Sequence, residues 1–188
     1  MKTESIESLF EENIKDLYDA EKQMVRALPK LVKAATSDEL TNAFQEHLEV
    51  TKTQVGRLEK VFQLISVKPK SKTCEGMKGL VAEGQEAIDQ EGEDTLRDVA
   101  LIGAAKRVEH YEMAGYQAAI LLADSMGNEE AGNLLRKTLA EEEEADGTLE
   151  SICQQLLENF TSETEVEADS DDQDRSRKNV RTRTAGSR

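Results

Sequence analysis

The sequence predicts an all-α protein: a four-helix bundle with one additional short crossover helix and a disordered C-terminal tail. Its 188 residues contain no Trp, three Tyr, four Phe and two Pro, whereas an all-β protein is rich in aromatic and turn residues. Long runs of Glu, Lys, Leu, Ala and Gln favour helices. Four long segments also carry apolar residues at three- and four-residue steps, which is the spacing of an amphipathic helix. A chain of this length fits a single domain.

The first two predicted helices form a tight hairpin. We expect the first over about residues 3–35, with Pro29 kinking or restarting it because proline removes a backbone donor. Thr36 and Glu39 have the spacing of a capping box, so a second helix opens there and runs to about Ser66. Because almost no loop separates the two helices, they must be antiparallel.

The second half of the chain repeats this arrangement. A short helix over about 74–90 carries three glycines and crosses between the two halves. Asp94 can cap a third long helix that runs to Met126, and a fourth spans about 129–160 after the Gly127 turn. Two hairpins joined by one long crossover make the ferritin-like bundle topology.

The bundle is expected to occupy residues 1–160 and the tail residues 161–188. Residues 161–174 hold seven acidic and no basic side chains, and residues 175–188 hold six basic and no acidic ones. With few large apolar groups, such a segment buries too little surface to order itself.

Charge and termini limit the possible functions. A net charge of −15 argues against a folded surface that neutralises nucleic-acid phosphates, which needs clustered Lys and Arg. The first residues are amphipathic and charged, so we expect neither a signal peptide nor a membrane span, and a cytoplasmic protein. Cys74 and Cys153 lie in neither a C-x-x-C nor a zinc spacing, which predicts free thiols without a catalytic role.

The most informative feature is a carboxylate at the middle of each long helix, where an apolar residue is expected. These acids are Glu21, Glu49, Glu109 and the run from Glu142 to Asp146. Burying one unpaired charge costs several kcal/mol. Acids that converge from different helices therefore need shared protons, cationic partners or metal ions, and we interpret them as a two-metal site.

Two-metal carboxylate bundles use one Glu from each of two helices and a Glu-x-x-His pair from each of the other two. On the third helix Glu109 and Glu112 share a face with Tyr116, one and two turns apart. On the fourth, either Glu142 or Glu143 could bridge the metals, and Asp146 would stand where a His is expected.

The second helix fits this pattern less well. It offers His47 and Glu49, either of which could be the ligand, and His47 lies nearer the apolar stripe. The residue three positions after Glu49 is Lys52, whose ammonium could itself neutralise a carboxylate cluster and replace one metal.

Five blocks of the chain, in order over about residues 4–158, resemble the YciE/YciF-like ferritin-like proteins, which are bacterial stress-associated helical bundles. The blocks read DLYDAEKQ, ALPKL, EHLEVTKTQVGRLE, RDVALIGAAKRVEHYEMAGY and TLAEEEEAD. The resemblance implies a ferritin-like fold, a homodimer and a two-metal site similar to that of rubrerythrins. It assigns the single ligands to Glu21 and Glu109, and the carboxylates of the paired motifs to Glu49 and Glu143.

Two functional hypotheses follow. The first is a redox protein, peroxidase- or ferroxidase-like, that binds two iron or manganese ions and handles peroxide, dioxygen or iron under stress; oxygen-rich ligation suits these metals. The second is a non-enzymatic stress-associated scaffold dimer that has lost a competent metal site. The expected ligands are Glu21, Glu49, Glu109, Glu112, Glu143 and Asp146, with His47 and Glu142 as alternatives.

Overall fold

The computed structural model describes the backbone of residues 5–184 and the side chains of residues 5–162. Five α-helices and no strands make up this part of the chain, which confirms the all-α prediction. In chain order they are α1 (Ile6–Ala34), α2 (Asp38–Leu64), α3 (Glu75–Ile88), α4 (Asp94–Ser125) and α5 (Glu129–Thr184).

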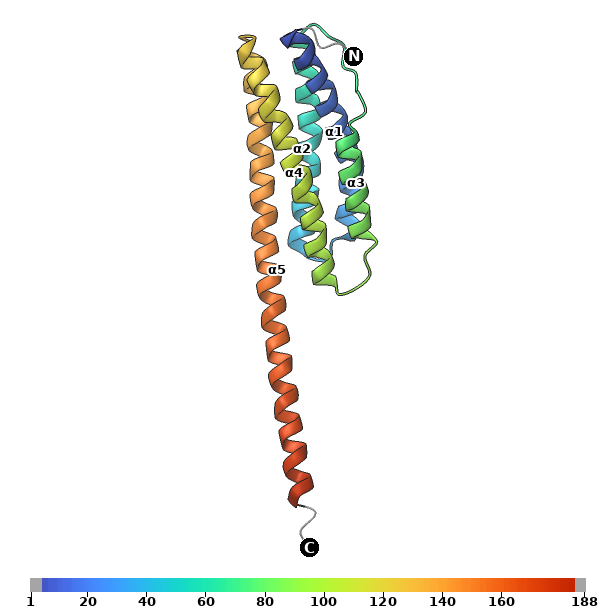
Figure 1. Cartoon of the computed structure of the whole chain (residues 1–188), viewed down its shortest axis with the longest axis vertical. Coiled ribbons are helices and arrows are strands. Elements are labelled where there is room, and N and C mark those ends of the chain that lie inside the picture. The colour runs from blue at the N-terminus through green and yellow to red at the C-terminus, as the bar shows by residue number, and fades with distance from the viewer. Residues whose placement is uncertain (1–4, 185–188) are drawn as a thin grey trace.

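The long helices pair as two hairpins, α1 with α2 and α4 with α5, and the short α3 packs against α1 and α4 (Figure 1). The second hairpin turns at Gly127, whose φ of +67° is a conformation that glycine adopts without steric cost. Asn128 then accepts a hydrogen bond from the Ala131 N–H and caps α5. This is the predicted ferritin-like bundle with a crossover helix.

The observed helix starts differ slightly from the predicted ones. Ser37, not Thr36, caps α2 by accepting from the Leu40 N–H at 3.4 Å. Thr36 is instead bound to the buried Asp98 of α4, with its hydroxyl 2.8 Å from a carboxylate oxygen. Asp98 thus ties the first hairpin turn to the second hairpin.

Three further features of the helices differ from the predicted ones. Glu93 caps α4 in place of Asp94, and α1 continues through Pro29 without restarting. The last helix α5 extends beyond the end of the bundle (Figure 1), past the expected boundary at residue 160. The side chains after residue 162 lie outside the described part, so the disordered tail over 161–188 stays a prediction.

The hydrophobic core is divided into two clusters, one toward each end of the bundle. The first contains Met24, Leu28, Phe44, Leu101 and their neighbours. The second is centred on these aromatic and aliphatic side chains: Phe10, Ile14, Leu58, Phe62, Tyr116 and Ile120. Where the clusters meet, each long helix buries polar residues instead, and this polar layer positions the candidate site.

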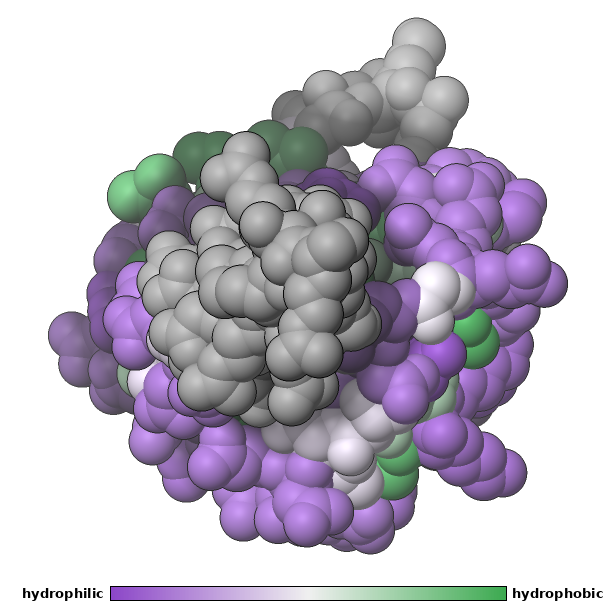
Figure 2. Space-filling model, turned by 90° about the horizontal axis from the view of Figure 1, so that it is seen from below, coloured by the Kyte–Doolittle hydropathy of each residue, from purple (hydrophilic) through white to green (hydrophobic). Residues whose placement is uncertain are grey.

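Hydrophilic residues make up most of the coloured surface in Figure 2, which views the molecule along the bundle axis. None of the helices, within the described residues, is long and apolar enough to cross a membrane. Both cysteines are free, as predicted. Cys74 has a structural role: its thiol lies 2.9 Å from the Tyr111 hydroxyl and 3.1 Å from Asp16, which fixes the start of α3 against α1 and α4.

Candidate metal centre

Four buried carboxylates converge in the polar layer. Glu21 comes from α1, Glu109 and Glu112 from α4, and Glu142 from α5, and each is at most 1% exposed. Glu109 and Glu112 are one turn apart, so both face the bundle axis. Acidic side chains are almost never fully buried without partners, so a set of four marks this layer as a candidate functional site.

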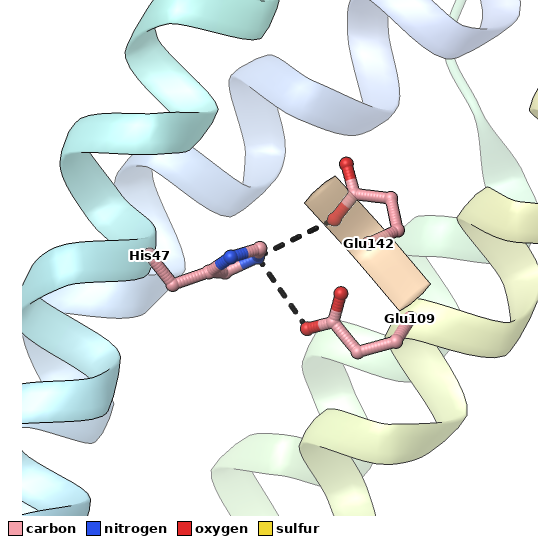
Figure 3. Close-up of side chains that lie close together, drawn as sticks. All are labelled: His47, Glu109 and Glu142. Carbon is pink, nitrogen blue, oxygen red and sulfur yellow. Dashed lines mark ion pairs between the residues drawn. The ribbon is translucent and has the colours of Figure 1, made fainter. Parts of the chain in front are cut away.

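His47 of α2 completes a compact group with two of these acids (Figure 3). Its Nε2 atom lies 3.4 Å from an oxygen of Glu109 and 3.8 Å from an oxygen of Glu142. One ligand atom from each of the three residues lies within 4.8 Å of the others. Burial lowers the pKa of His47 to about 4, so at neutral pH it is the uncharged imidazole that metals bind.

The acids themselves resist ionisation in this environment. Burial raises the pKa of Glu21 well above its ordinary value, and the nearby charge of Glu142 raises it further. Burial and neighbouring carboxylates do the same to Glu109 and Glu112, and burial raises the pKa of Glu142 to about 7. In the absence of a cation these groups must therefore hold protons among them.

Several of the buried carboxylate oxygens have no hydrogen-bond partner. Within the cluster they are one oxygen each of Glu21, Glu109 and Glu112, and both oxygens of Glu142. The Glu109 carboxyl and the Gln54 side chain are polar neighbours that act on the pKa of Glu142. The other oxygen of Glu21 accepts a hydrogen bond from the buried Tyr116 hydroxyl. Unpaired buried acceptors are uncommon and costly, and they are the donor atoms that a hard divalent cation requires. The residues present therefore fit a metal ion.

Beside this cluster lies a second buried polar group, in which a guanidinium is paired within the chain and only the Gln54 Oε1 atom has no hydrogen-bond partner. Arg57 is 6% exposed and donates to Glu141 through two nitrogens, at 2.7 and 2.9 Å. It also donates to Thr138 at 2.5 Å, while Gln54 donates to Glu141 at 3.2 Å. Gln54 and Arg57 have the three-residue spacing of a Glu-x-x-His pair, so α2 presents an amide and a guanidinium where that motif would present two ligands.

The structure brings together only part of the predicted ligand set. Glu21, Glu109 and Glu112 lie in the cluster, as do His47 and Glu142, the two alternatives. Glu49 and Glu143 are exposed, and Glu49 instead pairs with Lys52 at 2.6 Å on the surface. Asp146 is partly exposed and pairs with Lys106 at 3.0 Å and His110 at 3.2 Å.

Helix geometry explains why Glu49 and Glu143 lie outside the cluster. Each residue turns an α-helix by about 100°, so Glu143 points away from the bundle where its neighbour Glu142 points in. On α2, His47 lies close to the buried Phe44–Leu48 face, whereas Glu49 lies outside it. Lys52 therefore neutralises a surface acid rather than the cluster. The expectation that Glu49, Glu143 and Asp146 join the site is not met by their positions.

Gln54 and Arg57 are not among the site residues predicted from the sequence. Both continue the buried row of α2 after Thr51, at three-residue steps. The sequence signal for these two residues is a pair of polar residues on an otherwise apolar helix stripe. They lie at the same height along the bundle as the buried carboxylates.

A four-helix bundle with convergent buried carboxylates belongs to the ferritin-like class. Within it, the chain belongs to the family described as "Domain of unknown function (DUF892)", whose profile matches residues 5–162. This confirms the resemblance to YciE/YciF-like proteins. Protein YciF of Escherichia coli (strain K12) is 42% identical over 147 residues, which is 78% of this chain and 89% of that protein.

Solved structures agree with this assignment. The crystal structure of the E. coli stress protein YciF superposes with a TM-score of 0.81 at 39% identity, covering 83% of this chain and 99% of that one. YcfI, a putative structural protein from Rhodopseudomonas palustris, superposes with a TM-score of 0.77 at 33% identity, covering 80% and 98% of the two chains.

Proposed function

We propose that this protein is a ferritin-like metal carboxylate protein whose polar layer binds two divalent ions, iron or manganese, and uses them on peroxide, dioxygen or iron itself in a stress response. The observation that supports this most directly is the set of buried carboxylate oxygens without a hydrogen-bond partner. Leaving such acceptors unpaired is unfavourable, and cation binding removes that cost.

Charge balance favours two ions over one. The four buried carboxylates would carry four negative charges once ionised, and His47 adds none because it is neutral. Arg57 is already paired with Glu141. Two divalent ions match the four charges, and sites of this kind hold metals about 3.5–4 Å apart.

His47, Glu109 and Glu142, whose ligand atoms lie within 4.8 Å of one another, would hold one ion. Glu21 and Glu112 would contribute ligands to the other. Mostly oxygen donors with one imidazole suit iron or manganese. Bound in this layer, these metals would supply the electrons that reduce peroxide or dioxygen. Tyr116 holds Glu21 in place, and the two hydrophobic clusters close the layer toward both ends of the bundle.

The stress assignment comes from the E. coli relative, which is described as a stress protein. At 39% identity over nearly all of that chain, transfer of the role is reasonable as part of this proposal. A small oxidant is then the expected reaction partner, and a homodimer the expected assembly, which light scattering of the purified protein tests.

Metal content provides the direct test. Protein purified without chelator and loaded with Fe(II) or Mn(II) should hold about two ions per chain, measured by mass spectrometry of the metals. Glu109→Gln and Glu142→Gln keep the side-chain size but remove the anionic donor, and should lose most of the metal. The matched controls Glu49→Gln and Glu143→Gln change exposed acids of the same helices and should retain it. Equal content in all four variants would place the metal elsewhere.

The competing function, a scaffold without metal, is favoured by one observation: the raised carboxyl pKa values allow the acids to remain protonated and neutral. Metal content well below one ion per chain after loading, together with full folding of the protein, would support the scaffold and contradict our proposal.

A further inference from the structure

A surface pocket of about 200 Å³ opens between α2 and α5 and reaches the metal centre. His47 and Glu109 line it, with side chains 10% and 2% exposed. Val50 and Ala145 form part of its apolar wall, and two exposed acids, Glu46 and Glu144, lie at its outer part. At about 30 Å³ for each water molecule, it has room for several waters.

Two features of this pocket point to a cation. Glu46 and Glu144 form no ion pair with any residue that the structure describes, so their charges act on the pocket and the solvent near it. At the inner end, Glu109 is 1% exposed and one of its oxygens has no hydrogen-bond partner. The pocket therefore runs from free surface charge to an unsatisfied buried acceptor.

The remaining members of the centre, Glu21, Glu112 and Glu142, do not line this pocket, whereas His47 and Glu109 do. Glu141 also lines the pocket, but its carboxylate is bonded to Arg57, which with Thr138 holds α2 and α5 together. An ion that comes from solvent would thus meet His47 and Glu109 first.

We propose that this pocket is the uptake route of the metal centre, through which a hydrated divalent cation passes between Glu46 and Glu144 and exchanges its waters first for His47 and Glu109. The inference rests on the proposed metal-binding function and adds the path and the residues that control the rate. Acidic side chains around a cleft raise the local cation concentration and the association rate.

The rate of Mn(II) uptake tests this route in the full-length protein. Because the chain has no Trp and Tyr116 is bonded to Glu21, quenching of tyrosine fluorescence in a stopped-flow instrument reports arrival at the centre. The double variant Glu46→Gln/Glu144→Gln should take up Mn(II) about tenfold more slowly at low salt. The final amplitude should equal that of the wild type, and the difference in rate should shrink as ionic strength rises.

The matched control is Glu130→Gln/Glu143→Gln, which removes two exposed charges from α5 outside the pocket. Its uptake rate should stay within about twofold of the wild type. Equal slowing in both double variants would overturn the proposed route, because net charge alone would then explain it. No quenching in the wild-type protein, with no metal retained, would instead overturn the metal-binding function itself.

A steric variant gives an independent readout. Ala145→Phe places a ring in the pocket wall and should slow both Mn(II) uptake and its removal by a chelator, whereas Gln155→Phe changes an exposed residue of α5 outside the pocket and should slow neither. Unchanged rates in a folded Ala145→Phe protein would overturn the route. If that variant fails to fold, the charge variants still decide.

Discussion

The polar layer contains two neighbouring buried groups that differ in one respect. In the group of Arg57, Glu141, Thr138 and Gln54, the guanidinium is bonded to its partners within the chain. In the carboxylate cluster, four acids meet and several oxygens have no partner. The charge of Arg57 is neutralised by Glu141 within the chain. The carboxylate cluster has no such partner in the chain and needs protons or cations to balance its charges.

The difference matters because the charged groups of both are wholly or largely removed from water. The hydrogen bonds within a buried charge pair offset the cost of removing its charges from water. If one partner is removed, the other remains as a buried charge whose desolvation is no longer compensated. Like charges have no such recovery and raise one another's pKa. Loss of Arg57 should therefore affect folding, whereas loss of a cluster acid should affect metal binding.

The largest expected effect is on the pair of Arg57 and Glu141. Arg57→Leu should lower the free energy of unfolding by about 3 kcal/mol, with or without metal. The substitution removes the cation that pairs with Glu141 and the donor that bonds Thr138. Denaturant titration measures this. The control Arg136→Leu breaks an exposed pair with Asp124 and should cost at most about 1 kcal/mol. Equal costs would remove the distinction between the two groups.

For each bound ion, a slightly smaller effect is expected from filling the cluster. Mn(II) at a hundred times its dissociation constant should stabilise the folded protein by about 2.7 kcal/mol for each site, because it binds only the folded state. The melting temperature should rise accordingly. Glu109→Gln should show little of this rise, and an equal rise in that variant would show that Mn(II) acts at another site.

The cluster acids should give the metal-free protein a pH response of defined sign, which His47 opposes below about pH 6.5 because its folded-state pKa is lowered to about 4. Because the folded-state pKa of the cluster acids lies above the ordinary 4.5, and reaches about 7 for Glu142, the folded state binds more protons than the unfolded one. Stability from these groups is present below about pH 4.5 and is lost as pH rises toward 7 and above, at about 1.4 kcal/mol per pH unit for each proton.

Glu109→Gln tests the source of that slope. It removes one titrating acid, so the metal-free variant should lose less stability than the wild type over the same pH range, and at neutral pH should be more stable by roughly 1–2 kcal/mol. Parallel pH profiles for variant and wild type, from thermal or denaturant unfolding, would contradict the raised pKa of the cluster.

The smallest effect concerns the one hydrogen bond from a tyrosine to the cluster. Tyr116→Phe leaves an oxygen of Glu21 without its donor and should cost about 1 kcal/mol in the metal-free protein. Tyr18→Phe provides a comparison, since that hydroxyl bonds the partly buried Glu59 and should cost less. A larger cost for Tyr18→Phe would mean that Tyr116 does not support the cluster.

The fold could be predicted from the sequence almost entirely. Helix periodicity and the turn signal at Gly127 predicted the order and pairing of the helices within a few residues. The same periodicity placed Glu21, Glu109 and Glu112 in the interior, because each lies on an apolar stripe with well-spaced neighbours.

The rest of the site was ambiguous for a physical reason. Four consecutive acids from Glu141 to Glu144 cover more than a full helical turn, so composition alone does not say which one faces inward. The choice of Glu142 depends on the exact rotation of α5 against α2 and α4. Likewise, only packing shows that Arg57 is buried, because a long cationic side chain normally reaches solvent.

The division of the core into two hydrophobic clusters has a consequence for folding cooperativity. Each cluster joins segments of all four long helices at one end of the bundle, and the polar layer supplies weak contacts between them. In the metal-free state the two ends should open with unequal free energies, visible as two levels of amide hydrogen exchange. Ions bridging the layer would link the ends into a single cooperative unit.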